Sequence, residues 1–231
     1  MLSVQGVNQF YGESHTLWDA ELSLPTGACT CLMGRNGVGK TTLLKCVMGL
    51  LPIRSGAIRI GDADISRRPA EFRAGVGIGY VPQGREIFGQ LSIEENLLVG
   101  FSALRNKKVG AIERIYTTFP VLKKMRSRRG GDLSGGQQQQ LAIGRALMLS
   151  PKLLILDEPT EGIQPNIVSE IGEILAGLNR DEGLTILFVE QKLPFARKFA
   201  QHFVIMERGH TVASGAMTEL SEDLVSKHLV V

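Results

Sequence analysis

The sequence predicts an α/β protein whose sheet is mainly parallel and covered by helices. Short apolar stretches alternate with helical ones and are typical of buried strands: residues 57–60, 77–82, 153–158, 185–190 and 203–209. A glycine-rich turn at residues 34–39 joins a further apolar stretch to a helical one. Strands that are apolar on both faces need helices on both sides, which is the arrangement of a parallel α/β sheet.

The N-terminal part follows a different pattern. Residues 17–24, LWDAELSL, alternate between apolar and polar side chains, as a half-buried antiparallel strand does. Residues 28–33, ACTCLM, form the apolar strand before the glycine-rich turn, and a helix is expected from about Lys40 to Gly49. We therefore expect an N-terminal antiparallel β portion beside the parallel sheet.

The middle of the chain is helix-like. Residues 92–106, 109–127 and 135–150 all carry helical patterns, and the SPK sequence at residues 150–152 ends the last of them. We interpret residues 88–150 as a helical subdomain inserted into an α/β core made of residues 1–87 and 151–231. The whole chain, residues 1–231, is then a single domain.

Composition excludes several classes of protein. Hydrophobic residues make up 43% and charged residues 21%, which is ordinary for a globular protein. No apolar run reaches the roughly 18 to 20 residues that span a bilayer, and the N-terminus has no secretory pattern, so we expect a cytoplasmic protein. The three cysteines have no metal-ligand spacing.

The net charge is only +3, although basic residues cluster at residues 122–131. A solvated helix face explains this cluster better than a site for anionic headgroups or an acidic partner. No aromatic residues are interleaved with the basic ones, so no nucleic acid is expected as a partner.

Residues 34–42, GRNGVGKTT, match the phosphate-binding pattern G-x-x-x-x-G-K-[ST]. The glycines allow backbone N–H groups to point at phosphate oxygens, Lys40 reaches the β- and γ-phosphates, and the Thr41 hydroxyl can bind Mg²⁺. The alternative, a glycine-rich turn that only caps a helix, is weak here. The expected nucleotide-binding residues are Gly34, Arg35, Asn36, Gly37, Val38, Gly39, Lys40, Thr41 and Thr42.

Residues 153–159, LLILDEP, supply the carboxylates that such a loop requires. Asp157 is placed to bind Mg²⁺ directly or through water. Glu158 is placed to act as the general base that polarises the attacking water. Together the two motifs predict a site that hydrolyses a nucleoside triphosphate.

The stretch LSGGQQQQ, residues 133–140, predicts a helix start that binds an anion. Ser134 and Gln137 have the spacing of a capping box, and Gly135 and Gly136 leave bare N–H groups at the positive end of the helix. The glutamines at 138–140 are ordinary helix formers, and we expect them to face solvent.

With LSGGQ between GRNGVGKTT and LLILDEP, the chain resembles the ABC (ATP-binding cassette) ATPases over essentially its whole length. The resemblance implies an ABC-type P-loop NTPase core, with ATP and Mg²⁺ bound. It implies that Tyr11 stacks on adenine, although a core tyrosine is the alternative, and that Gln83 joins the Mg²⁺ site to the helical subdomain. It also implies that Ser134, Gly135, Gly136 and Gln137 face ATP on a second ABC subunit.

Two positions depart from the family pattern. Gln191 stands where a histidine usually contacts the γ-phosphate, and Gln164 replaces an aspartate that communicates across the dimer. Gln191 can still donate a hydrogen bond, but it carries no positive charge. We expect slow hydrolysis by the chain alone and faster hydrolysis in a heterodimer whose other subunit carries the histidine.

Residues 80–88, 157–165 and 188–191 together resemble cassettes of the branched-chain amino-acid importers, and EGIQP at 161–165 is similar to the urea-importing branch. The implied partners are a second ABC subunit, transmembrane permease subunits and, indirectly, a secreted solute-binding protein. The implied location is the inner face of the cell membrane.

Ile87, Phe88, Leu91 and Ile93 form an apolar cluster that either receives a permease helix or belongs to the core. Two other functions remain as alternatives: an ABC ATPase without a transport role, and a regulatory subunit of low activity. The intact Glu158 argues against the second.

Overall fold

The computed structural model describes residues 1–102 and 110–229. Its main sheet has the strand order β10-β9-β3-β8-β7-β6. Five of these strands are parallel and β10 is antiparallel to β9. The strands are β3 (Cys29–Met33), β6 (Ile78–Val81), β7 (Leu153–Asp157), β8 (Thr185–Val189), β9 (His202–Glu207) and β10 (His210–Ala216).

A second sheet is antiparallel, with the order β2-β1-β4-β5. It contains β1 (Leu2–Tyr11), β2 (Ser14–Leu24), β4 (Ser55–Ile60) and β5 (Ala63–Asp64). The Thr211 hydroxyl on β10 donates to the Glu21 carbonyl on β2 at 2.6 Å, so the two sheets are joined at one edge. The predicted α/β class, with a mainly parallel sheet and an N-terminal antiparallel portion, is confirmed.

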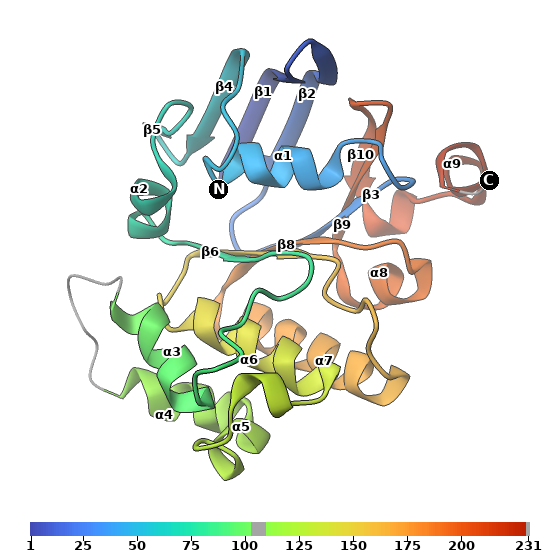
Figure 1. The fold of residues 1–231 in the computed structure, drawn as a ribbon. Coiled ribbons are helices and arrows are strands. Elements are labelled where there is room, and N and C mark those ends of the chain that lie inside the picture. Colours follow the sequence, from blue (N-terminus) through green and yellow to red (C-terminus); the bar gives the residue numbers. More distant parts are fainter. Residues whose placement is uncertain (103–109, 230–231) are drawn as a thin grey trace.

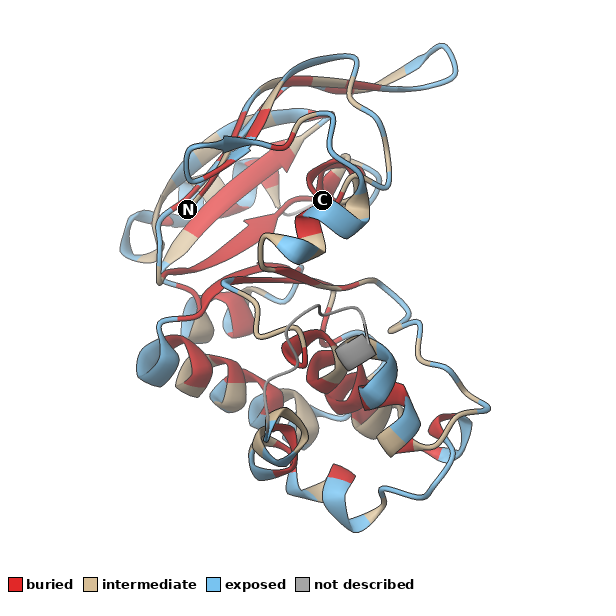
Figure 2. Ribbon diagram, turned by 90° about the vertical axis from the view of Figure 1, so that its left-hand side faces the viewer, coloured by how far each residue is buried: buried red, intermediate tan, exposed pale blue. Residues whose placement is uncertain are grey.

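Alternating side chains of the parallel strands build two separate cores. On β7, Leu153 and Ile155 pack against the antiparallel sheet and α1 (Lys40–Val47), whereas Leu154 and Leu156 pack against helices on the other face. Figure 1 shows α1 between the two sheets and the helices α6 and α7 below the main sheet. Figure 2 shows the buried residues concentrated along these strands.

Helices connect the strands and cover the sheet. Between β6 and β7 lie α3 (Ile93–Ser102), α4 (Ala111–Thr118), α5 (Pro120–Lys124), a 3-10 turn at Gly130–Asp132 and α6 (Gly135–Leu147). The others are α2 (Ala70–Gly75), α7 (Pro165–Glu182), α8 (Leu193–Phe199), the 3-10 turn Met217–Glu219 and α9 (Glu222–His228). Within the described ranges, no helix is long and apolar enough to cross a membrane.

The stretch at residues 109–127 is not one helix. Phe119, before Pro120, has φ −127° and ψ 78°, outside the helical region, and it separates α4 from α5. Proline disfavours a helical conformation in the residue that precedes it, which explains the break. Of the helix predicted at 92–106, residues 103–106 lie outside the described residues.

A buried arginine closes the C-terminal end of α1. Arg73 donates to the carbonyls of Cys46 at 2.7 Å and Val47 at 2.6 Å, and its Nε donates to the Arg68 carbonyl at 2.9 Å. Burial lowers the pKa of Arg73 below its ordinary value. A cation at this end complements the negative end of the helix dipole, so Arg73 fixes the helix whose other end follows the glycine-rich loop.

Candidate functional site

The predicted motifs meet at the carboxyl edge of the main sheet. The loop at residues 34–39 follows β3, Glu158 follows β7 and Gln191 lies two residues after β8. Because β3, β8 and β7 are neighbouring parallel strands, their carboxyl ends lie side by side. Ligand sites of α/β sheets form at this edge.

The loop at residues 34–42 has the conformation that its glycines permit. Gly34, Gly37 and Gly39 have φ values of 146°, 78° and 106°, in the left-handed region that favours glycine. A Cβ on Gly34 would lie 2.4 Å from the Met206 carbonyl oxygen, so a side chain does not fit there. Gly39 is the N-cap of α1, and the first turn of α1 contains no acidic residue, which leaves its positive end open to an anion.

Lys40 lies inside this loop. Its Nζ donates to the carbonyls of Gly34 and Arg35, both at 2.8 Å, and the residue is only 5% exposed. Burial lowers the pKa of Lys40, while the charges of Glu158 and Asp157 oppose that shift. The loop therefore surrounds a nearly buried ammonium group.

Asp157 is a buried carboxylate at the end of β7. Neither side-chain oxygen has a hydrogen-bond partner within the described part of the chain. Burial raises the pKa of Asp157, whereas the nearby Thr41 hydroxyl lowers it. An unpaired buried carboxylate beside a threonine hydroxyl provides the hard oxygen donors that Mg²⁺ prefers, so these residues fit the predicted metal.

Glu158 and the two glutamines form one polar cluster. Gln191 Nε2 donates to Glu158 Oε1 at 2.6 Å and to Asn36 Oδ1 at 2.7 Å. Gln83 Nε2 donates to Glu158 Oε2 at 3.4 Å and to Glu161 Oε2 at 3.0 Å. The cluster borders a cavity of about 510 Å³. Glu158 has φ 49°, a conformation that is strained for a residue other than glycine and is typical of active sites.

Sequence reasoning missed Glu190, which supports this cluster. Glu190 is buried at the end of β8, and its carboxylate accepts hydrogen bonds from the Thr160 hydroxyl at 2.5 Å and the Gln191 N–H at 3.0 Å. It thereby connects the segment after Glu158 to the segment that carries Gln191. Its position as a carboxylate ending an apolar strand, like that of Asp157, was the available signal.

Ser134 and Gln137 form the predicted capping box at the start of α6. Gln137 N donates to Ser134 Oγ at 3.4 Å, and Ser134 N donates to Gln137 Oε1 at 3.0 Å. Packing also favours glycine at position 136, because a Cβ there would lie 2.6 Å from Ile167 Cγ2. Among the described residues, none of the hydrogen bonds of Ser134 and Gln137 reaches the loop at residues 34–42.

The prediction that the glutamines after Gln137 face solvent is wrong for two of them. Gln139 and Gln140 are 3% and 2% exposed. Helical periodicity turns them towards the protein, and Arg85 donates from Nε to Gln139 Oε1 and from Nη1 to Gln138 Oε1, each at 3.3 Å. The run is therefore part of the packing around Arg85.

Tyr11 is the last residue of β1 and is 48% exposed, so it is not a core tyrosine. Three rings of the same hairpin form a stack: Phe10 with His15 at a centroid distance of 4.0 Å, and His15 with Trp18 at 3.5 Å. Trp18 N donates to the Gly209 carbonyl at 3.0 Å, and Gly209 N donates to the Val38 carbonyl at 2.9 Å. This hairpin is thus connected to the loop at residues 34–42.

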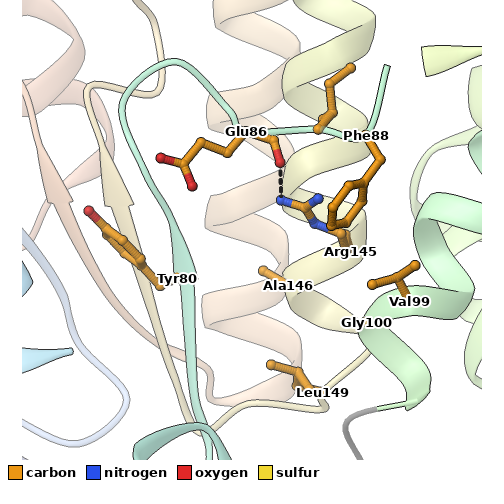
Figure 3. Close-up of a pocket in the computed structure, with 9 residues that line it drawn as sticks. Tyr80, Glu86, Phe88, Val99, Gly100, Arg145, Ala146 and Leu149 are labelled. Carbon is orange, nitrogen blue, oxygen red and sulfur yellow. Dashed lines mark hydrogen bonds between the residues drawn. The ribbon is translucent and has the colours of Figure 1, made fainter. Parts of the chain in front are cut away.

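The apolar cluster after Gln83 divides between core and surface. Ile93 is fully buried, whereas Phe88 is 46% exposed at a groove of about 480 Å³. Figure 3 shows Arg145 beside the Phe88 ring, with Val99 and Leu149 further along the groove. The Arg145 guanidinium lies 5.1 Å from the centroid of that ring.

Comparison with known proteins agrees with this geometry. The family model described as "ABC transporter" matches residues 17–161. The branched-chain amino acid transport ATP-binding protein BraG of Pseudomonas aeruginosa is 39% identical and aligns over 92% of this chain and 91% of its own length. The chain belongs to the ABC transporter ATP-binding family.

Relatives of similar identity include both import and export proteins by name. The probable branched-chain amino acid protein LivF of Archaeoglobus fulgidus is 34% identical over 96% of this chain and 94% of its own length. The lipopolysaccharide export protein LptB of Escherichia coli is 33% identical over 96% of this chain and 93% of its own length. Among solved structures, the ABC transporter cassette MJ1267 superposes with a TM-score of 0.84 at 27% identity, covering 98% and 97% of the two chains.

These comparisons establish three of the predictions. The chain has the ABC ATPase fold, it is an ABC ATPase related to the ATP-hydrolysing subunits of transporters, and its nucleotide is ATP. The roles of individual residues and the division at residues 88–150 stay predictions.

Proposed function

We propose that this chain is the ATP-hydrolysing subunit of an importer of the branched-chain amino-acid type. The observation that carries the proposal is the position of Glu158, held by Gln191 and Gln83 at the same sheet edge as Lys40 and Asp157. The 39% identity to an ATP-binding protein of branched-chain amino acid transport supports this assignment.

The roles within the site follow from its chemistry. Backbone N–H groups of residues 34–42 and the Lys40 ammonium hold the phosphates of ATP, and Tyr11 presents an exposed ring on which adenine stacks. Thr41, Asp157 and Gln83 are the residues that would hold Mg²⁺, which when bound neutralises phosphate charge. Glu158 accepts the proton of the attacking water, while Gln191 fixes the orientation of its carboxylate.

A second ABC subunit completes the catalytic unit. Within the described part of the chain, the side-chain hydrogen bonds of Ser134 and Gln137 stay between residues 125 and 137, which suits a role of Ser134, Gly135, Gly136 and Gln137 towards ATP held by the partner. Gln191 and Gln164 favour a heterodimer, because a partner with a histidine supplies the positive charge that glutamine lacks.

The groove at Phe88 suits a helix of a transmembrane permease subunit. Phe88 is exposed, and it lies in the same segment as Gln83, so closure around ATP can reach the permease. The chain then operates at the inner face of the cell membrane, with a secreted solute-binding protein delivering the solute. The helices at residues 88–150 act as the unit that carries this groove.

The identity of the transported solute is the most specific part of the proposal. The names of the relatives favour branched-chain amino acids, whereas EGIQP at residues 161–165 favours urea. Deletion of this chain in its host, followed by uptake of radiolabelled urea and leucine, separates the two. If the deletion leaves the uptake of both urea and leucine unchanged, neither solute is the one transported.

Measuring ATP hydrolysis by the wild type and by Glu158→Gln tests the enzymatic proposal. We expect the variant to bind ATP and to hydrolyse it at least about 100-fold more slowly. Equal inactivity of both proteins, with permease and partner subunits present, would favour a regulatory subunit. Full activity without any effect of permease subunits would favour an ABC ATPase that has no transport role.

A further inference from the structure

The turn after Gln83 stores backbone strain. Arg85 has φ 70° and Glu86 has φ 47°, so two consecutive residues other than glycine occupy the left-handed region. This conformation is unfavourable for a residue with a Cβ, and such strain persists only where the surroundings hold it. The contacts of this turn therefore indicate what it is held against.

The Arg85 side chain is the first of these contacts. Its guanidinium donates to three acceptors: Gln139 Oε1 at 3.3 Å, Gln138 Oε1 at 3.3 Å and the Glu161 carbonyl at 3.0 Å. The two glutamines lie in α6, a few residues after Ser134, and Glu161 lies three residues after Glu158. One side chain thus bonds to two segments that are distant from it in the sequence.

The first residue of α6 also lies close to Arg85 and to the segment after Glu158. A Cβ on Gly135 would lie 3.3 Å from the Gly162 carbonyl and 3.4 Å from both terminal nitrogens of Arg85. The guanidinium therefore lies against the first residue of α6 and close to the segment after Glu158. The three segments thus meet at the Arg85 guanidinium.

Arg145, which lies further along α6, binds the backbone carbonyls of the same turn. Its Nη2 donates to the Glu86 carbonyl at 2.8 Å (Figure 3). The same nitrogen donates to the Arg85 carbonyl at 3.4 Å. The turn is therefore fixed to α6 from both sides, by its own arginine and by an arginine of the helix. Gln83, two residues before Arg85, meanwhile donates to the Glu158 and Glu161 carboxylates.

We propose that Arg85 is a positioning residue for ATP hydrolysis: its guanidinium joins the turn that carries Gln83, the start of α6 and the segment after Glu158, so that these three respond to ATP together. This inference deepens the proposed function and rests on it. Arg85 touches neither ATP nor the attacking water; it acts through Gln83 and through the Ser134–Gln137 turn.

The chemistry requires an arginine and neutral acceptors. A planar guanidinium presents five N–H groups in fixed directions and can serve three acceptors at once, whereas a lysine ammonium is a single point charge. Gln138 and Gln139 accept these bonds without adding a charge near the helix end where the partner's phosphate is expected. This gives two of the four consecutive glutamines a function in the site.

The test compares purified full-length wild type, Arg85→Ala and Arg85→Lys, with Arg59→Ala as the matched control. Arg59 is an exposed arginine on β4. For Arg85→Ala we expect kcat to fall about tenfold with the KM for ATP within about twofold, because the lost hydrogen bonds act on the transition state rather than on ATP binding. Arg85→Lys is expected to recover no more than about a third of the wild-type kcat.

Hydrogen–deuterium exchange supplies a readout that does not depend on hydrolysis. Arg85→Ala is expected to raise exchange together at residues 83–88, 134–138 and 160–163, whereas Arg59→Ala leaves all three unchanged. Gln138→Ala is a second variant, and we expect it to lower kcat about threefold; it stands alone as the test if Arg85→Ala folds poorly. If Arg85→Ala folds well, adding Gln138→Ala to it is expected to lower kcat no further.

Either of two kinetic results would overturn the inference: kcat of Arg85→Ala within twofold of the wild type, whether or not KM is raised, or full recovery by Arg85→Lys. A change in exchange confined to one of the three segments would also overturn it. If the wild type itself does not hydrolyse ATP, the proposed function fails, and the exchange data still decide whether Arg85 links the three segments.

Discussion

The side-chain amide of Gln191 bridges Glu158 and Asn36, at 2.6 Å and 2.7 Å. One amide group therefore connects the proposed general base to the phosphate-binding loop. The amide holds Glu158 without adding a charge beside it.

Replacing Gln191 tests the value of this bridge. For Gln191→Ala we expect kcat to fall roughly tenfold with little change in the KM for ATP, because the Glu158 carboxylate loses its closest donor. Steady-state ATP hydrolysis is the measurement, and Gln5→Ala, at an exposed position on β1, is the control. A wild-type rate in Gln191→Ala would show that Glu158 is positioned by other groups.

The missing histidine makes a second prediction about assembly. We expect slow ATP turnover by the isolated chain and faster turnover when it is mixed with a second ABC subunit that carries the histidine. Turnover per ATP site, measured across mixing ratios, is the readout. Equal turnover by the isolated chain and by the mixed assembly contradicts the heterodimer proposal.

The burial of Asp157 is expected to lower the stability of the nucleotide-free protein, although the carboxylate is needed to bind Mg²⁺. Burial raises its pKa above the ordinary 3.8, so the folded state disfavours the carboxylate. Stability therefore falls as pH rises from the unfolded-state value through the raised folded-state value, and the loss persists at neutral pH. We expect Asp157→Asn to raise the Tm of the nucleotide-free protein at pH 7 by a few degrees, on the order of 1 kcal/mol, and to have little effect at pH 4.

The same variant is expected to lose the increase in Tm that Mg²⁺ adds in the presence of ATP. Differential scanning fluorimetry with and without Mg²⁺ measures both effects. Asp62→Asn, at an exposed position, is the matched control. An unchanged Mg²⁺ response in Asp157→Asn would remove Asp157 from the metal site.

Arg73 is expected to contribute strongly to stability. Arg73→Met leaves the buried Val47 carbonyl without its guanidinium donor and the Cys46 carbonyl with only the Gly49 N–H, which costs about 2 to 3 kcal/mol and lowers the Tm by roughly 5 to 10 °C. Arg67→Met changes an exposed arginine nearby and serves as the comparison. Equal melting temperatures for the two variants would show that water replaces the guanidinium.

Phe88 tests the proposed docking groove. Phe88→Ala is expected to leave ATP hydrolysis by the isolated chain within about twofold, because the ring is exposed and lines a different cavity from Glu158, and to abolish transport by the full assembly. Uptake into proteoliposomes is the measurement. Phe72→Ala, another exposed phenylalanine, is the control; transport that survives Phe88→Ala counts against docking at this groove.

Local patterns predicted the parts of the site that depend on backbone conformation. The glycines at 34–39 and the capping box at Ser134 are encoded within a few residues, so the sequence was sufficient for them. Apolar runs likewise predicted the parallel strands, because a strand that is buried on both faces has apolar side chains at successive positions instead of alternating apolar and polar ones.

Contacts between distant segments could not be predicted in this way. The sequence around Glu190 and Arg85 does not identify their partners, Thr160 and Gln139, which lie 30 and 54 residues away. The burial of Gln139 and Gln140 has the same origin, since only the packing of α6 against its neighbours decides which side of a glutamine-rich helix faces inwards.

Trp18 is the single tryptophan of the chain. Its indole stacks on His15, and its backbone is connected through Gly209 to the Val38 carbonyl of the phosphate loop. The protein therefore contains an intrinsic optical probe beside the proposed nucleotide site. Stopped-flow fluorescence can time the arrival and departure of ATP without a label, in wild type and variants alike.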